Sequence, residues 1–135
     1  MKRSFVRLLL AVVALAAACS AFAQPYPNRP VKLVVPFAAG SGSDIFARLM
    51  AEDLRHAFNQ SFIVENKPGA SAQIGAEFVA KAPPDGYTLF VATNTSHSAN
   101  PFLFKTLRYD PVRDFTAIIR VLSMPYVLVV ATNRV

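Results

Sequence analysis

Cysteine is almost absent from this 135-residue chain, which has Cys19 alone. That residue lies in an N-terminal segment that we expect to be removed, so the mature chain can form neither a disulfide nor a cysteine metal site. The sequence also lacks internal repeats, low-complexity tracts and long charge runs. Because it has no basic stripe interleaved with aromatic residues, it lacks the pattern of a nucleic-acid-binding protein.

The N-terminus has the three parts of an export signal. Basic residues precede an apolar run at 8–18, and the small residues Ala21 and Ala23 mark a cleavage site. We therefore predict a signal peptide at 1–23 and a mature N-terminus at Gln24. Removal of the signal takes away three of the 14 Lys and Arg residues against 8 Asp and Glu, which lowers the formal net charge from +6 to about +3.

Two alternatives to a cleaved signal stay open. The first is an uncleaved membrane anchor, which the apolar run is too short to form comfortably. The second is a lipoprotein attached through Cys19, but Leu15 stands one position too far upstream for a good lipid-attachment sequence. We expect the protein to be periplasmic, released by cleavage of its signal.

A strand, a small-residue loop and a helix directly follow the signal. Residues 32–37 are apolar and β-branched, as in a strand that is buried on both faces. Apolar residues three and four apart predict an amphipathic helix over 45–58. Between them, Ser41 and Asp44 match a capping box in the loop 38–44. Such a loop presents backbone N–H groups to an anion, and a carboxylate there disfavours an acidic solute unless it points at N–H groups.

Strands and helices continue to alternate along the chain. After the first helix we predict a strand at 62–64, a helix at 73–82, a strand at 87–92, a short helix over 100–105 capped by Asn100, a turn at Asp110, and strands at 117–122 and 126–131. The order β-α-β-α-β requires parallel strands with right-handed crossovers. The predicted fold class is therefore α/β, with an open, mostly parallel sheet and flanking helices.

Small or polar loops follow the first three predicted strands, at 38–44, 69–73 and 93–98. Ligands of open parallel sheets bind outside the carboxyl ends of the strands. If the three strands are neighbours, these loops converge on one patch. The sequence therefore predicts a binding site for a small acidic solute at this edge.

Other chemical patterns are incomplete. The loop around Gly40 and Gly42 lacks the third glycine of a dinucleotide fingerprint, and no Gly-Lys-Ser/Thr is present for a P-loop. The segment 69–73 lacks the last glycine of a serine-hydrolase elbow. His97 could donate a hydrogen bond, act as a base or be structural. No complete set of nucleophile, base and orienting group is visible, but an exported α/β hydrolase that uses Ser71 or His97 stays an alternative.

Residues 26–44, YPNRPVKLVVPFAAGSGSD, resemble the start of the Bug-type receptors, the periplasmic substrate-binding proteins of tripartite tricarboxylate transporters. The resemblance continues in order through 64–70, 74–77, 85–89, 100–101 and 109–115. It covers essentially the whole mature chain.

The resemblance implies a first lobe, residues 24–135, of a two-lobed type II periplasmic binding protein fold. Family members are much longer, so the second lobe is expected to be missing. The implied function is to carry a small carboxylate or related organic solute to membrane permease subunits, as a monomer, without catalysis, metal or cofactor. A sensory module that presents the solute to a membrane sensor kinase and a nonfunctional remnant stay open.

In this family, backbone groups, small hydroxyls and ordered waters hold the solute. By position, the candidate ligand-binding residues are Phe37, Ala39, Gly40, Ser41, Gly42, Ser43, Ser71, Ala72, Gln73, Thr93, Asn94, Thr95, Ser96 and His97. The family commonly has two adjacent glycines at Gly40-Ser41 and Gly-Gly-Asn at Ser71-Ala72-Gln73. The added side chains narrow the approach to the backbone and change which solute fits.

Overall fold

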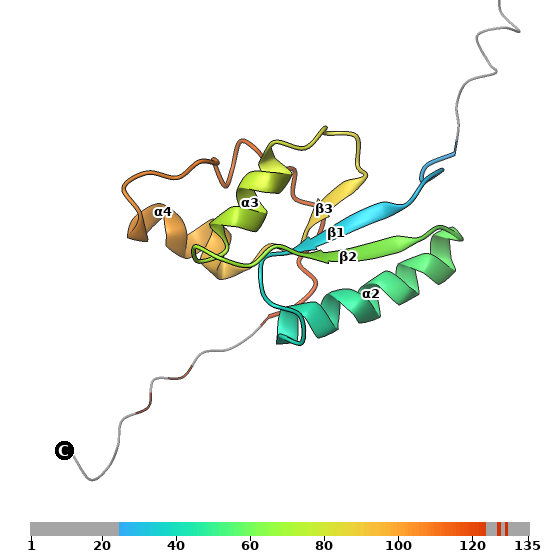
Figure 1. Ribbon diagram of the computed structural model, residues 1–135, viewed down its shortest axis with the longest axis horizontal. Coiled ribbons are helices and arrows are strands. Elements are labelled where there is room, and N and C mark those ends of the chain that lie inside the picture. Colours follow the sequence, from blue (N-terminus) through green and yellow to red (C-terminus); the bar gives the residue numbers. More distant parts are fainter. Residues whose placement is uncertain (1–24, 124–126, 128, 130–135) are drawn as a thin grey trace, which may run out of the picture.

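The structure, a computed structural model, describes residues 25–123, 127 and 129. Its elements in chain order are β1 (Val31–Val35), α2 (Gly42–Phe58), β2 (Phe62–Asn66), α3 (Gln73–Ala80), β3 (Thr88–Phe90), the π-helical turn η2 (Thr95–Ala99) and α4 (Asn100–Leu103). The three strands form one parallel sheet of order β2-β1-β3, with β1 in the centre (Figure 1). The α/β class and the parallel sheet predicted from the alternating pattern are confirmed.

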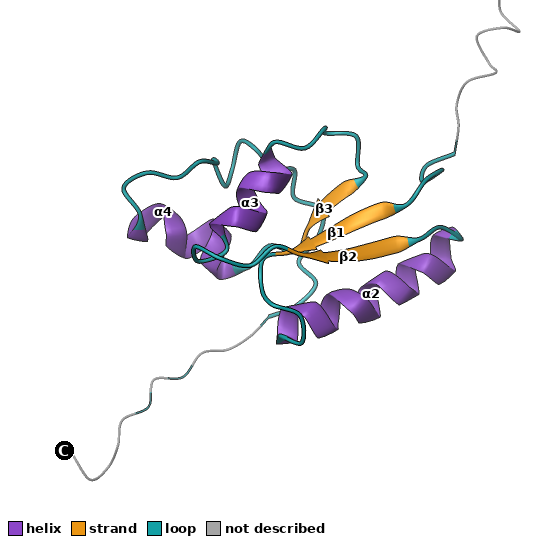
Figure 2. Cartoon of the chain, viewed as in Figure 1, coloured by secondary structure: helices purple, strands orange, loops and turns teal. Residues whose placement is uncertain are grey.

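Helices cover both faces of the sheet (Figure 2). α2 packs on β1 and β2, and α3 packs on β1 and β3 from the opposite side. Alternate residues of β1 point to opposite faces of the sheet. Leu33 and Val34 of β1 are both buried, as are Ala47 and Ala51 of α2. Pro36, which follows β1, meets α3 on the other side, where it leaves room only for the hydrogen of Gly75.

Several element boundaries differ from the prediction. α2 begins at Gly42 rather than at residue 45, because the capping residue Ser41 stands three positions before Asp44 and the helix starts directly after its cap. β2 is two residues longer than predicted, and β3 spans only Thr88–Phe90. α3 ends at Ala80 instead of residue 82, since residues just before a proline disfavour helical backbone.

The predicted role of Asn100 as a helix cap is wrong. Its backbone is helical, as is that of Ala99 before it, because η2 runs directly into α4 and no separate start is needed. α4 ends at Leu103, two residues short of the prediction, where Phe104 turns to extended backbone. The predicted turn at Asp110 is present, and its carboxylate accepts the N–H groups of the second and third residues after it, at 2.8 and 2.9 Å.

The predicted strand at 117–122 is not formed. These residues lie outside any sheet and are exposed, with Ile118 and Ile119 about three-quarters exposed. Apolar, β-branched composition favours a strand, but a strand also requires a neighbour to pair with, and none of the described residues pairs with this segment. The predicted strand at 126–131 lies outside the described residues, apart from two isolated positions, as does the predicted signal at 1–23.

In the part of the chain that the structure describes, no helix is both long and apolar enough to span a membrane.

Candidate functional site

The loops that follow the three strands lie side by side. We call residues 36–41 the first loop, 67–72 the second loop, and 91–94, which lead into η2, the third loop. Where the second loop begins, the N–H of Lys67 donates to the carbonyl of Val35 at 2.8 Å, and where the third begins, the N–H of Val91 donates to Val34 at 2.9 Å. Both loops therefore leave the sheet beside the end of β1, as the parallel order requires.

The first loop is held by a buried carboxylate. Asp44 is 2% exposed. It accepts hydrogen bonds from the backbone N–H of Gly40 at 2.8 Å, from Arg48 at 3.0 Å and from the Asn66 amide at 2.9 Å. The hydroxyl of Ser41 accepts the N–H of Asp44 at 3.3 Å, so the predicted cap is confirmed. The Asp44 carboxylate thus points at a backbone N–H. This is the arrangement in which, by the sequence argument above, a carboxylate in this loop does not disfavour an acidic solute.

These contacts set the charge of the first loop. The hydrogen bond from Arg48, with those from the Gly40 N–H and Asn66, lowers the pKa of Asp44 to about 2, so the group is ionised at neutral pH. The N–H of Gly40, in the first loop just before α2, is therefore used by the protein itself and is not available to a solute. Arg48, which is half exposed and 3.0 Å from the carboxylate, balances its charge.

The remaining backbone of the first loop faces outward. Ala39, Gly40 and Gly42 are exposed, whereas Phe37 and Ser43 are half-buried. Gly40 has φ +83°, a left-handed conformation that glycine adopts without strain. Because the first N–H groups of an α-helix have no intrahelical acceptor, the start of α2 supplies donors at this exposed surface.

The second loop contains a strained turn. After Gly69, three successive non-glycine residues have left-handed backbone: Ala70 at φ +47°, Ser71 at +53° and Ala72 at +70°. Such a conformation costs an L-residue about 1–2 kcal/mol. Ser71 is exposed, Gln73 is half-buried, and Ala72 is buried at the start of α3. Two of these strained residues stand where the resemblance leads us to expect glycines.

The third loop folds into η2 around a buried serine. Ser96 is fully buried, and its hydroxyl donates to the Thr93 carbonyl at 3.0 Å and accepts the Thr93 N–H at 3.2 Å. Asn94 is exposed and Thr95 is half-buried. The Thr93 hydroxyl oxygen is buried without a hydrogen-bond partner among the described residues. The Ser96 side chain therefore shapes the loop from inside, while the rim of the loop carries the accessible polar groups.

His97 packs against two aromatic rings. Its ring centroid lies 5.8 Å from that of Phe90 and 4.8 Å from that of Phe115. Burial lowers the pKa of His97, which favours a neutral imidazole. Its Nδ1 is 3.0 Å from the Ser96 hydroxyl. This pair has the spacing of a nucleophile and its base, but the hydroxyl is fully buried and already bonded within the loop, so it is not presented to a substrate.

Two buried side chains that the site prediction did not include join the second loop to η2. The Asn100 amide donates to the Ser71 carbonyl at 2.8 Å and to the Tyr109 hydroxyl at 3.1 Å, and that hydroxyl donates to the Ser96 carbonyl at 2.6 Å. Asn66 joins the first loop to β2 in the same way, through the Phe37 carbonyl at 3.0 Å. In the sequence, these residues are ordinary polar positions. Only their place in the segments that carry the family resemblance marks them.

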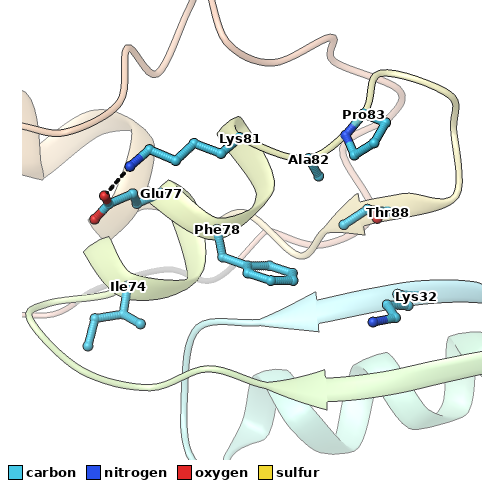
Figure 3. Close-up of a pocket in the computed structure, with 8 residues that line it drawn as sticks. All are labelled: Lys32, Ile74, Glu77, Phe78, Lys81, Ala82, Pro83 and Thr88. Atoms are coloured by element: carbon cyan, nitrogen blue, oxygen red, sulfur yellow. Dashed lines mark hydrogen bonds and ion pairs between the residues drawn. The ribbon is translucent and has the colours of Figure 1, made fainter.

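A shallow groove of about 590 Å³ lies elsewhere, on the sheet face beside α3 (Figure 3). Its lining residues are Lys32, Ile74, Glu77, Phe78, Lys81, Ala82, Pro83 and Thr88. Phe78 points from α3 toward the strands, and Lys81 pairs with Glu77 at 2.6 Å. Because its lining includes none of the candidate ligand-binding residues, the groove is separate from the three loops. Among the described residues, no three His, Cys, Asp or Glu side chains group as a metal site.

Comparison with known proteins identifies the family. Residues 46–134 match the model of the tripartite tricarboxylate transporter family receptor. The chain belongs to this receptor family. It is 44% identical over 127 residues to a UPF0065 protein of Bordetella bronchiseptica, covering 93% of this chain and 38% of that protein. The resemblance to the Bug-type receptors is thereby confirmed.

Solved structures agree with this assignment. MatC from Rhodopseudomonas palustris, with bound malate, has a TM-score of 0.65 and 42% identity, over 67% of this chain and 31% of that one. A second R. palustris protein, solved with adipate, has a TM-score of 0.63 and 44% identity, over 64% and 29%. Periplasmic binding protein BugD has a TM-score of 0.63 and 44% identity, over 67% and 30%. The chain spans about a third of the length of these receptor-family relatives.

Proposed function

We propose that the chain is the first lobe of an extracytoplasmic receptor that captures a small carboxylate for a tripartite tricarboxylate transporter. The observation that carries the proposal is the meeting of three polar loops at the carboxyl edge of a sheet in this receptor family. Two solved relatives, each matched over about two thirds of this chain, hold the dicarboxylic acids malate and adipate. The proposed ligand-binding residues are those named from the resemblance. Of these, Ala72 and Ser96 are buried, so we expect them to act through the shape of their loops.

The loops suit an anion without a dedicated cationic side chain. The start of α2 contributes backbone N–H groups and the positive end of its dipole. Ser71 and Asn94 add exposed neutral polar groups. The buried Asp44 carboxylate opposes an anion, but Arg48 balances it. One lobe encloses only half a ligand, so we expect tight binding to require a second lobe that closes over the same loops.

The wider assignments belong to the same proposal. Residues 1–23 act as a cleaved signal and 24–135 form the lobe, which places the protein in the periplasm. The receptor delivers its solute to membrane permease subunits as a monomer and performs no catalysis. Presentation of the solute to a membrane sensor kinase is the alternative use of the same site, and co-purification with a permease subunit or with a kinase separates the two.

A thermal-shift titration with malate and adipate, each taken to concentrations high enough for the weak binding expected of one lobe, tests the proposal. A ligand that binds only the folded chain raises its free energy of unfolding, by about 2.7 kcal/mol at a ligand concentration of a hundred times Kd. The melting temperature rises accordingly. We expect both acids to raise it and the uncharged diamide of adipate to leave it unchanged. No shift with either acid would remove the support for a carboxylate receptor, and turnover of either acid would show an enzyme instead.

A pair of matched charge variants locates the site. Ser71→Asp adds a carboxylate on the second loop, while Asn59→Asp adds one at the far end of α2, about 25 Å from its start. Both positions are exposed and left-handed, at φ +53° and +51°. Repulsion across about 6 Å should weaken acid binding about tenfold for Ser71→Asp. Equal affinities in the two variants would place the bound acid elsewhere.

A further inference from the structure

Two buried side chains that lie outside the site loops hold those loops together. Asn100 is completely buried and Tyr109 is 6% exposed. Through them, the carbonyl of Ser71 in the second loop is linked to the carbonyl of Ser96 in η2, by hydrogen bonds of 2.8, 3.1 and 2.6 Å. We call this pair the Asn100–Tyr109 clamp.

The direction of each bond in the clamp is determined by its chemistry. The Ser71 carbonyl only accepts, so the amide nitrogen of Asn100 must face it. The second hydrogen of this nitrogen goes to the Tyr109 hydroxyl, whose own hydrogen then goes to Ser96. Hydrogen bonds in such a chain strengthen one another. The clamp is therefore a single unit in which neither side chain can turn without breaking a buried bond.

The clamp also fixes a peptide plane in the strained turn. A trans peptide is planar, so the carbonyl of Ser71 and the N–H of Ala72 point in opposite directions. Because Asn100 draws the carbonyl inward, the Ala72 N–H is directed away from the clamp. The side-chain oxygen of Asn100 is buried without a partner among the described residues.

We infer that Asn100 and Tyr109 are positioning residues of the solute site, a role that rests on the proposed function. They do not contact the solute. They hold the left-handed turn of the second loop against η2, so that a carboxylate meets a preformed wall and the loops need not be ordered on binding. Preorganisation of this kind raises affinity by removing an entropy cost.

The variant Tyr109→Phe tests the clamp. It removes one oxygen and keeps the ring, which stands edge-on to the Phe115 ring with the two ring centroids 6.1 Å apart. The matched control is Tyr87→Phe, which removes a hydroxyl that donates to the Asn28 side chain at 2.8 Å, far from the three loops. For the whole chain and both variants, one measures amide hydrogen exchange by residue and malate affinity by calorimetry, after circular dichroism has shown that each folds.

We expect Tyr109→Phe to speed exchange at least about tenfold in both 69–75 and 93–99, the effect of losing the two buried hydrogen bonds of the hydroxyl, and to weaken malate binding severalfold. Tyr87→Phe should change neither. Faster exchange in one segment only, or in neither, overturns the inference, and so does unchanged malate affinity when both segments loosen. If the parent chain binds neither malate nor adipate, the proposed function fails, and the exchange rates alone decide whether the clamp couples the loops.

Discussion

Replacement of Ser71 by glycine should stabilise this protein. Ser71 has φ +53°, which costs an L-residue about 1–2 kcal/mol and glycine nothing. The gain is partly offset by the greater entropy of glycine in the unfolded chain, about 0.4–1 kcal/mol. The serine side chain is exposed, and the bond from Asn100 goes to the backbone carbonyl, so glycine loses no contact of the clamp. The net stabilisation is about 0.5–1 kcal/mol.

Thermal melts followed by far-UV circular dichroism measure this effect. For a domain of this size, about 1 kcal/mol raises Tm by about 4–8 °C, so the variant should melt about 4 °C higher. Ser98→Gly is the matched control, because Ser98 is also an exposed serine but lies in the right-handed turn η2. There glycine only adds entropy to the unfolded chain, and stability should fall by about 0.5–1 kcal/mol.

The reasoning is refuted if Ser71→Gly melts at or below the parent temperature while Ser98→Gly behaves as expected. That result would mean that the turn is not strained in the folded protein. A second consequence follows for binding. If strain in the second loop is retained for a preformed site, the more stable Ser71→Gly variant should bind malate more weakly than the parent, since relief of the strain leaves the turn freer to move.

Two further predictions concern packing and pH. Gly75→Ala should lower the free energy of unfolding in urea by about 1 kcal/mol, because the new methyl group would lie 3.0 Å from the Pro36 ring. Gly42→Ala is the control and should not lower it, because nothing lies within 4 Å of the added carbon. Equal effects of the two variants would contradict this reasoning. Burial lowers the pKa of His97 below 6.5, so the unfolding free energy should hold its full value above pH 6.5 and fall as the pH drops through the folded-state pKa. His97→Gln should flatten this dependence and the exposed His56→Gln should not; a parental slope in His97→Gln would disprove it.

Local patterns in the sequence determined the α/β class. Apolar, β-branched runs and three-to-four spacings identified the elements up to the third strand. The alternation of strand and helix required a parallel sheet, because a helix between two strands carries the chain back to the edge where the first strand began. Ser41 and Asp44 also act locally, since a cap reaches only three residues along the chain. The family followed from motifs in order along the chain, with no need of the fold.

Only the tertiary structure decided which polar groups face each other. The meeting of Asn100 with Ser71 spans 29 residues, and that of Tyr109 with Ser96 spans 13, so no local spacing marks them. The same holds for the absent strand at 117–122, whose composition is right but whose pairing depends on a neighbour. Hydrogen bonds between distant segments form only after the sheet has brought their loops to one edge. Local spacing in the sequence therefore does not show which of these polar groups will meet in space.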